Sequence, residues 1–161
     1  DNLGCVLQAR LFRTRADVDR LLAGGPGLDV RLVKGIYLEP PEIAWTEGDH
    51  ITGSYAELAD ALVEGGAHVA FATHDDQLAN ACARIVQRAG LDSGPAQERT
   101  YEFQLLMGVR RQVADALKAE GHRVRLYVPY GSDWHAYSLR RLRKNPQVAK
   151  HVLRALVGRE G

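Results

Sequence analysis

Two adjacent arginines and a tyrosine near the end of the chain have the spacing of an anion clamp. Tyr137, Arg140 and Arg141 occupy positions i, i+3 and i+4 of a segment with helical periodicity, so their side chains can face one way. Neighbouring guanidinium groups bind a carboxylate through charge-assisted, bidentate hydrogen bonds. Tyr127, on the β-rich run before this segment, is a candidate wall of the same pocket. The alternative is a solvated basic face, because further arginines and lysines follow.

Another cation, Arg31, lies in an apolar run, Arg31–Tyr37 (RLVKGIY). Alternation along a strand places Arg31 and Gly35 on one side and Lys34 on the other. A guanidinium keeps its charge when buried, which suits an anionic or electron-accepting ligand. Gly35 leaves room for a flat ligand or for a closely approaching backbone. The alternative is that Arg31 pairs with a neighbouring carboxylate in a structural layer.

Thr73 and His74 end a third β-rich run, where a helix is expected to begin. A hydroxyl, an imidazole and the first N–H groups of a helix can together bind phosphate. Asp75 and Asp76 follow, and we expect them to be helix N-terminal charges instead, since they would repel a phosphate.

Familiar catalytic patterns are absent from the sequence, including GxSxG, GxGxxG, HxH and HExxH. We therefore expect no metal site, and we expect the chemistry to belong to a bound cofactor.

The elements that must position these residues alternate along the chain. The β-rich runs are Cys5–Leu11, Val30–Leu38, Ala67–Thr73, Tyr101–Leu106 and Val124–Pro129. Segments with helical periodicity are Thr14–Ala23, Ser54–Gly65, Gln77–Ala89, Arg110–Glu120 and Asp133–Leu142. Ser54 and Glu57 match a capping box, which predicts a helix start there and a long preceding loop, Glu39–Gly53.

Strands that alternate with helices predict βα units and a parallel sheet. Several runs carry polar residues, which would be costly in a doubly wound sheet but can line the mouth of a (βα)8 barrel. These residues are Gln8, Arg31, Lys34, Glu102, Gln104 and Arg125. A complete barrel needs about 250 residues. We therefore expect one α/β domain, residues 1–161, covering about the last five βα units of a TIM-like barrel.

Composition is that of an ordinary globular protein, with 161 residues, 45% hydrophobic residues and a net charge of +1. The balanced charge gives no reason to expect nucleic acid as a partner. No apolar run is long enough to span a membrane. Cys5 and Cys82 lack any metal or redox spacing, which is typical of buried, reduced thiols in an intracellular protein. The first residues do not form a signal peptide, and we expect a cytoplasmic location.

Taken together and in order, five motifs resemble the proline dehydrogenase family, especially its monofunctional bacterial type. They are VLQARL, VRLVKGIYLEP, FATHD, YEFQLLMGV and RLYVPYGSDWHAYSLRRLRKNP. The resemblance implies a distorted (βα)8 barrel that binds FAD and oxidises L-proline to 1-pyrroline-5-carboxylate. It also implies that electrons pass to a membrane quinone, with possible peripheral contact at the inner membrane, in the first step of proline degradation to glutamate.

The resemblance also implies roles for individual residues. Arg31 would be catalytic and would lie beside the flavin N5, where a cation favours the reduced, anionic flavin. The cofactor-binding positions would be Gln8, Arg31, Lys34, Gly35, Ile36, Thr73 and His74. The substrate-binding positions would be Tyr37, Leu106, Tyr127, Tyr137, Arg140 and Arg141. Lys144 departs from the family, which commonly has a glutamate there.

The family's active-site lysine and aspartate lie on earlier strands, before the first residue of this chain. We therefore expect the 161 residues to be a fragment that is inactive alone and that needs the upstream half of the barrel. Two alternatives stay open. One is another (βα)8 enzyme, acting on a phosphorylated metabolite through Thr73 and His74. The other is an inactive binding fragment.

Overall fold

The computed structural model of the chain describes residues 3–25, 27–96, 100–128 and 130–132. Its strands are β1 (Cys5–Gln8), β2 (Asp29–Val33), β3 (His68–Ala72), β4 (Tyr101–Leu106) and β5 (Val124–Tyr127). Its helices are α1 (Thr14–Leu22), α2 (Gly48–Glu64), α3 (Asp76–Arg88) and α4 (Arg111–Ala119). The expected helix Asp133–Leu142 lies outside the described residues.

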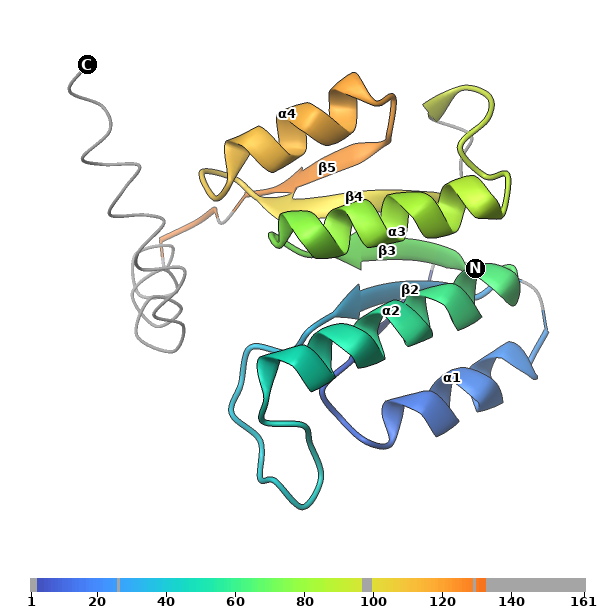
Figure 1. Cartoon of the computed structure of the whole chain (residues 1–161), viewed down its shortest axis with the longest axis vertical. Coiled ribbons are helices and arrows are strands. Elements are labelled where there is room, and N and C mark those ends of the chain that lie inside the picture. Colours follow the sequence, from blue (N-terminus) through green and yellow to red (C-terminus); the bar gives the residue numbers. More distant parts are fainter. Residues whose placement is uncertain (1–2, 26, 97–99, 129, 133–161) are drawn as a thin grey trace.

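The five strands form one parallel sheet in the order β1-β2-β3-β4-β5. Each neighbouring pair is joined by a helix, and right-handed crossovers between sequential parallel strands place every such helix on the same face. Figure 1 shows this arrangement, with α1 to α4 all in front of the sheet. A doubly wound sheet would have helices on both faces, so the topology is that of a barrel segment, as expected.

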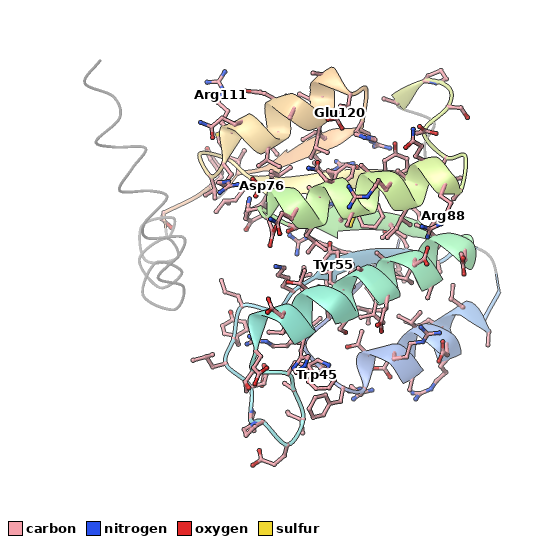
Figure 2. The ribbon with its side chains drawn as sticks, in the orientation of Figure 1. Trp45, Tyr55, Asp76, Arg88, Arg111 and Glu120 are labelled. Carbon is pink, nitrogen blue, oxygen red and sulfur yellow. The ribbon has the colours of Figure 1, made fainter. Side chains whose placement is uncertain are left out.

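The face toward the helices is apolar. Val30, Leu32, Phe71 and Phe103 are at most 1% exposed, and they pack in one core with residues of α2, α3 and α4. Tyr55 points from α2 into this core (Figure 2), where its hydroxyl donates to the Leu32 carbonyl at 3.0 Å. Burial of these side chains is the main force that holds the helices on the sheet.

Cys82 belongs to the same core. It is fully buried, and burial raises the pKa of its thiol to about 12. Cys5 is only partly buried. The expectation of a buried thiol is confirmed for Cys82 and holds in part for Cys5.

The opposite face is called the inner face here, and its residues alternate with those of the core. In register across the strands it carries Val6, Arg31, Ala70 and Glu102 in one row, and Gln8, Val33, Ala72, Gln104 and Arg125 in the next. The polar residues that the sequence places in the strands thus gather mostly on this face.

The expected strand Val30–Leu38 is too long. Strand β2 ends at Val33, because Lys34 turns toward the helices to pair with Asp75 and Gly35 adopts a φ of 99°. The expected strand Cys5–Leu11 likewise ends at Gln8, although the N–H of Ala9 still donates to the carbonyl of Val33 at 2.8 Å.

The predicted start of the second helix is wrong. Helix α2 begins at Gly48 after an extended Glu47, and Ser54 lies within it. The Ser54 hydroxyl donates to the Ala9 carbonyl at 2.8 Å and ties α2 to the end of β1. Ser54 therefore makes a tertiary contact and does not cap the helix. The loop predicted as Glu39–Gly53 ends at Glu47 in the structure.

The helix starts lie at the edge where the strands end. Asp76 and Arg111, at the starts of α3 and α4, lie at this edge, and Arg88, at the end of α3, lies at the opposite edge (Figure 2). Within the described ranges, every helix is too short or too polar to cross a bilayer.

Candidate functional site

Several of the predicted site residues that the structure describes lie at the carboxyl edge of the sheet. Because all the strands are parallel, their carboxyl ends lie at one edge of the sheet, to which the labelled arrows β2 to β5 point in Figure 1. Gln8 ends β1, Lys34 follows β2, Thr73 follows β3 and Leu106 ends β4. In barrels of βα units this edge carries the ligand site.

Arg31 is held on the inner face by an amide. Its Nε donates to Oε1 of Gln104 at 2.7 Å, and the Nε2 of Gln104 donates to Oε1 of Glu102 at 2.7 Å. The terminal nitrogens of Arg31 make no hydrogen bond to any other described residue. Within the described ranges Arg31 therefore pairs with an amide and with no carboxylate, which differs from the alternative of a structural ion pair.

Glu102 is the anion at the far end of this arrangement. Its residue is 2% exposed, and its carboxylate accepts from Nε and Nη2 of Arg125 at 2.7 and 2.9 Å. The Nε of Arg123 lies 3.2 Å away. Burial alone would raise the pKa of Glu102, but the hydrogen bonds from Arg125 and Gln104 outweigh it and lower that pKa. Glu102 is therefore ionised at neutral pH.

The inner-face network, defined as Arg31, Gln104, Glu102, Arg125 and Arg123, carries an excess of positive charge. It contains three guanidinium groups and one carboxylate. Arg125 and Arg123 pair directly with Glu102, whereas the partner of Arg31 in the described part of the chain is a neutral amide. Within this network, Arg31 is therefore the guanidinium group whose charge is available to an anionic or electron-accepting ligand.

Lys34 lies on the other side of the sheet from Arg31, as strand alternation predicts. Its Nζ donates to Oδ2 of Asp75 at 2.8 Å and to Oγ1 of Thr52 at 3.0 Å. Burial alone would raise the pKa of Asp75, but the bonds from Lys34 and from the N–H of Leu78 lower it. Lys34 thus fixes the end of β2 against α2 and α3.

Thr73 and His74 follow β3 directly. Thr73 is 6% exposed, and its Oγ1 accepts from the N–H of Asp75 at 3.1 Å. The Oδ1 of Asp75 accepts from the N–H of Leu78 at 3.2 Å and so caps α3, as expected for a helix N-terminal charge. Because a carboxylate already occupies the first turn of α3, this helix end is unfavourable for a phosphate.

Gly35 packs against Gln8 and Arg10. A Cβ at Gly35 would lie 2.7 Å from Oε1 of Gln8 and 2.9 Å from Cδ of Arg10. Arg10 is 8% exposed, and its Nη1 donates to the Tyr37 carbonyl. The space that Gly35 leaves is therefore taken by two side chains of the chain itself.

The remaining described positions form two groups. Leu106 and Tyr127 are cross-strand partners at the ends of β4 and β5, and the register brings them together. Ile36 and Tyr37 lie in the segment after β2, and Tyr37 is half exposed. The predicted substrate-binding residues Tyr137, Arg140 and Arg141 lie outside the described residues.

A flavin suits the polar groups that the inner face presents. Oε1 of Gln8 is buried and has no hydrogen-bond partner among the described residues, so it can accept from a ring N–H. The terminal guanidinium nitrogens of Arg31 are donors for a ring nitrogen or carbonyl. Both residues lie on the same face of neighbouring strands. The described residues hold no cluster of His, Cys, Asp or Glu that could hold a metal ion.

The sequence patterns do not assign Glu102, Gln104 and Arg125 to the site, although all three are polar residues in β-rich runs. Their shared strand positions are the signal that could have grouped them, because rows of a parallel sheet align such residues. Arg123 precedes β5 and carries no comparable signal.

Comparisons with known proteins place the chain in a family. The proline dehydrogenase profile matches residues 1–154. Proline dehydrogenase of Deinococcus radiodurans is 35% identical over 160 residues, covering 98% of this chain and 48% of that protein. Proline dehydrogenase 2 of Bacillus subtilis is 36% identical over 146 residues, covering 91% of this chain and 46% of that protein. The chain therefore spans about half the length of these relatives.

Solved structures of proline utilization A are also similar. The enzyme of Bdellovibrio bacteriovorus, inactivated by N-propargylglycine, superposes with a TM-score of 0.76 at 27% identity, covering 90% of this chain and 17% of that chain. A second proline utilization A superposes with a TM-score of 0.76 at 25% identity, covering all of this chain and 18% of that one. The sequence, the parallel sheet and these matches agree, and the chain belongs to the proline dehydrogenase family.

Proposed function

We propose that this chain supplies the flavin-facing and proline-binding part of an FAD-dependent L-proline dehydrogenase. The observation that carries the proposal is Arg31, which is held at 2.7 Å by the amide of Gln104 and pairs with no carboxylate of the residues that the structure describes. Family membership gives the reaction class, and this cation on the inner face suits an electron-accepting ring.

The overall reaction balances with a quinone as the acceptor. L-proline loses a hydride from C5 and the proton of its ring nitrogen, and becomes 1-pyrroline-5-carboxylate. The quinone gains the same two electrons and two protons, and becomes a quinol. When bound, FAD would supply the two-electron chemistry that links these half-reactions.

The chain's own residues bind and orient the reactants. Arg31 provides a positive charge where negative charge develops, and Gln8 accepts a hydrogen bond through its buried Oε1. Lys34, Gly35, Ile36, Thr73 and His74 form the cofactor-binding end of the strands in this proposal.

The substrate is held from the other end of the chain. Arg140 and Arg141 bind the proline carboxylate in this proposal, while Tyr37, Leu106 and Tyr127 exclude water and shape the pocket for a five-membered ring. Tyr137 lies on the same predicted helix as the arginine pair and completes the pocket.

The test is a steady-state assay of the complete gene product, with L-proline and a short-chain quinone. We expect 1-pyrroline-5-carboxylate to form and Arg31→Met to slow its formation at least tenfold. A wild-type protein that leaves proline unchanged would overturn the proposal. Formation of the product at the wild-type rate by Arg31→Met would remove Arg31 from the catalytic role.

A barrel enzyme acting on a phosphorylated metabolite is less consistent with the site. Asp75 caps α3 with its own carboxylate, and the neighbouring Asp76 adds a second negative charge. For the complete protein we propose a cytoplasmic location, with peripheral contact at the inner membrane where a quinone is reached.

A further inference from the structure

The inner-face network has a neutral side chain between two charged ones. We propose that Gln104 is a positioning residue that tethers Arg31 and, as a neutral spacer, keeps Arg31 from being neutralised by Glu102. The inference rests on the proposed function, because Arg31 is taken to face the bound FAD.

The hydrogen-bond chemistry gives the Gln104 amide a single orientation. A guanidinium only donates and an ionised carboxylate only accepts. The amide must therefore turn its NH2 to Glu102 and its carbonyl to Arg31, which is the observed arrangement, with both bonds at 2.7 Å.

Glu102 is a fixed anchor for that amide. It is 2% exposed on β4 and is held by two hydrogen bonds from Arg125 at 2.7 and 2.9 Å. With Arg123 at 3.2 Å as well, its charge is already compensated. Glu102 can therefore orient Gln104 without drawing Arg31 into an ion pair.

Small residues on the intervening strand open the path for Arg31. Arg31 is on β2 and Gln104 on β4, so the guanidinium must cross β3 to make its bond. The inner-face residues of β3 are Ala70, which pairs with Arg31 in register, and Ala72, which pairs with Gln104. Adjacent strands are about 4.8 Å apart. A larger side chain at Ala70 would stand in the way.

The test compares variants of the complete, flavin-loaded protein. Gln104→Met removes both hydrogen bonds at similar volume, and Gln104→Glu places a carboxylate beside Arg31. Gln87→Met, on the exposed side of α3, is the matched control. The readouts are the rate of flavin reduction by L-proline, the Kd for proline and the flavin reduction potential.

For Gln104→Met we expect at least tenfold slower flavin reduction with a proline Kd within twofold of wild type. For Gln104→Glu we expect the equilibrium for flavin reduction to fall about tenfold, which is a shift of about 30 mV to lower potential. Gln87→Met should match wild type. Unchanged rate and potential in both Gln104 variants would overturn the proposal.

A second set of variants keeps the proposal testable if Gln104→Met does not fold. Ala70→Leu blocks the path with Gln104 intact and should slow flavin reduction in the same way, whereas Ala70→Ser should not. Ala70→Leu at the wild-type rate would contradict the tether.

One readout needs no flavin. In the ¹⁵N spectrum of the complete protein, the Nε–H of Arg31 should exchange slowly with solvent and should exchange at least tenfold faster in Gln104→Met. Equal exchange would overturn the tether itself. If proline fails to reduce the wild-type flavin while the exchange rates differ, the proposed function fails and the tether stands.

Discussion

Gly35 shows at the scale of one residue why the end of β2 requires glycine. Its φ of 99° is unfavourable for any residue with a side chain, and a Cβ there would meet Oε1 of Gln8 at 2.7 Å. We expect Gly35→Ala to lower the free energy of unfolding by about 2 to 3 kcal/mol, from backbone strain and from the clash together.

The control for Gly35 is Gly66. It has a φ of 75° with nothing within 4 Å of its missing Cβ, so Gly66→Ala should lose only about 1 kcal/mol. Urea unfolding of both variants measures the difference. Equal losses would mean that the close approach of Gln8 adds nothing.

Glu102 makes stability depend on pH. Its pKa in the folded state is lowered below the ordinary value of 4.5, so it stabilises the fold fully above that value and loses this contribution as pH falls through the folded pKa. We expect Glu102→Gln to be less stable at pH 7 by about 2 kcal/mol, since bonds to a charged group are lost.

The pH profile separates this effect from general acid sensitivity. Unfolding free energies measured from about pH 6 down to pH 3 should fall more steeply for wild type than for Glu102→Gln. Parallel curves would show that Glu102 has the same pKa in the folded and unfolded protein.

At the scale of elements, the start of α3 depends on Asp75. Its carboxylate caps the helix at the N–H of Leu78 and also accepts from Lys34. Asparagine caps as well as aspartate, so Asp75→Asn should lose only a few tenths of a kcal/mol, whereas Asp75→Ala should lose about 1 kcal/mol. Thermal unfolding of the two variants measures the difference. Equal losses would assign the stabilisation to the ion pair with Lys34.

The strands could be predicted from the sequence because parallel strands are buried and read as apolar runs. The start of α2 could not, because Glu47 makes no side-chain cap and Gly48 is a poor helix former. The capping-box match at Ser54 and Glu57 predicts the wrong helix start, because the Ser54 hydroxyl donates to the Ala9 carbonyl after β1 instead of capping its own helix. A contact between residues so far apart in the chain cannot be predicted from the spacing of neighbouring residues.

The candidate site, like the fold, could be predicted from the sequence only in part. Arg31 can be recognised in the sequence because burying a cation in an apolar strand is costly unless a partner or a ligand compensates it. Its partner Gln104 is 73 residues away, and only the register of three strands brings the two together. The family resemblance identifies Arg31 as a site residue, whereas the Gln104 amide that holds it can be identified only from the structure.

At the scale of the whole molecule, the two outer strands of the described sheet, β1 and β5, each pair with one neighbouring strand. Among the described residues, β1 pairs only with β2, and β5 pairs only with β4. Unpaired strand edges promote association. We expect the 161 residues expressed alone to self-associate and to bind no FAD, as measured by light scattering and absorbance. A monodisperse, yellow fragment would contradict this.

The measurement that tests the central claim most directly is a visible absorption spectrum of the complete gene product without oxygen, before and after L-proline is added. We predict flavin bands that bleach on addition, because the site is proposed to bind FAD and oxidise proline. Flavin bands that persist would contradict the substrate, and a protein that stays colourless after reconstitution with FAD would contradict the cofactor.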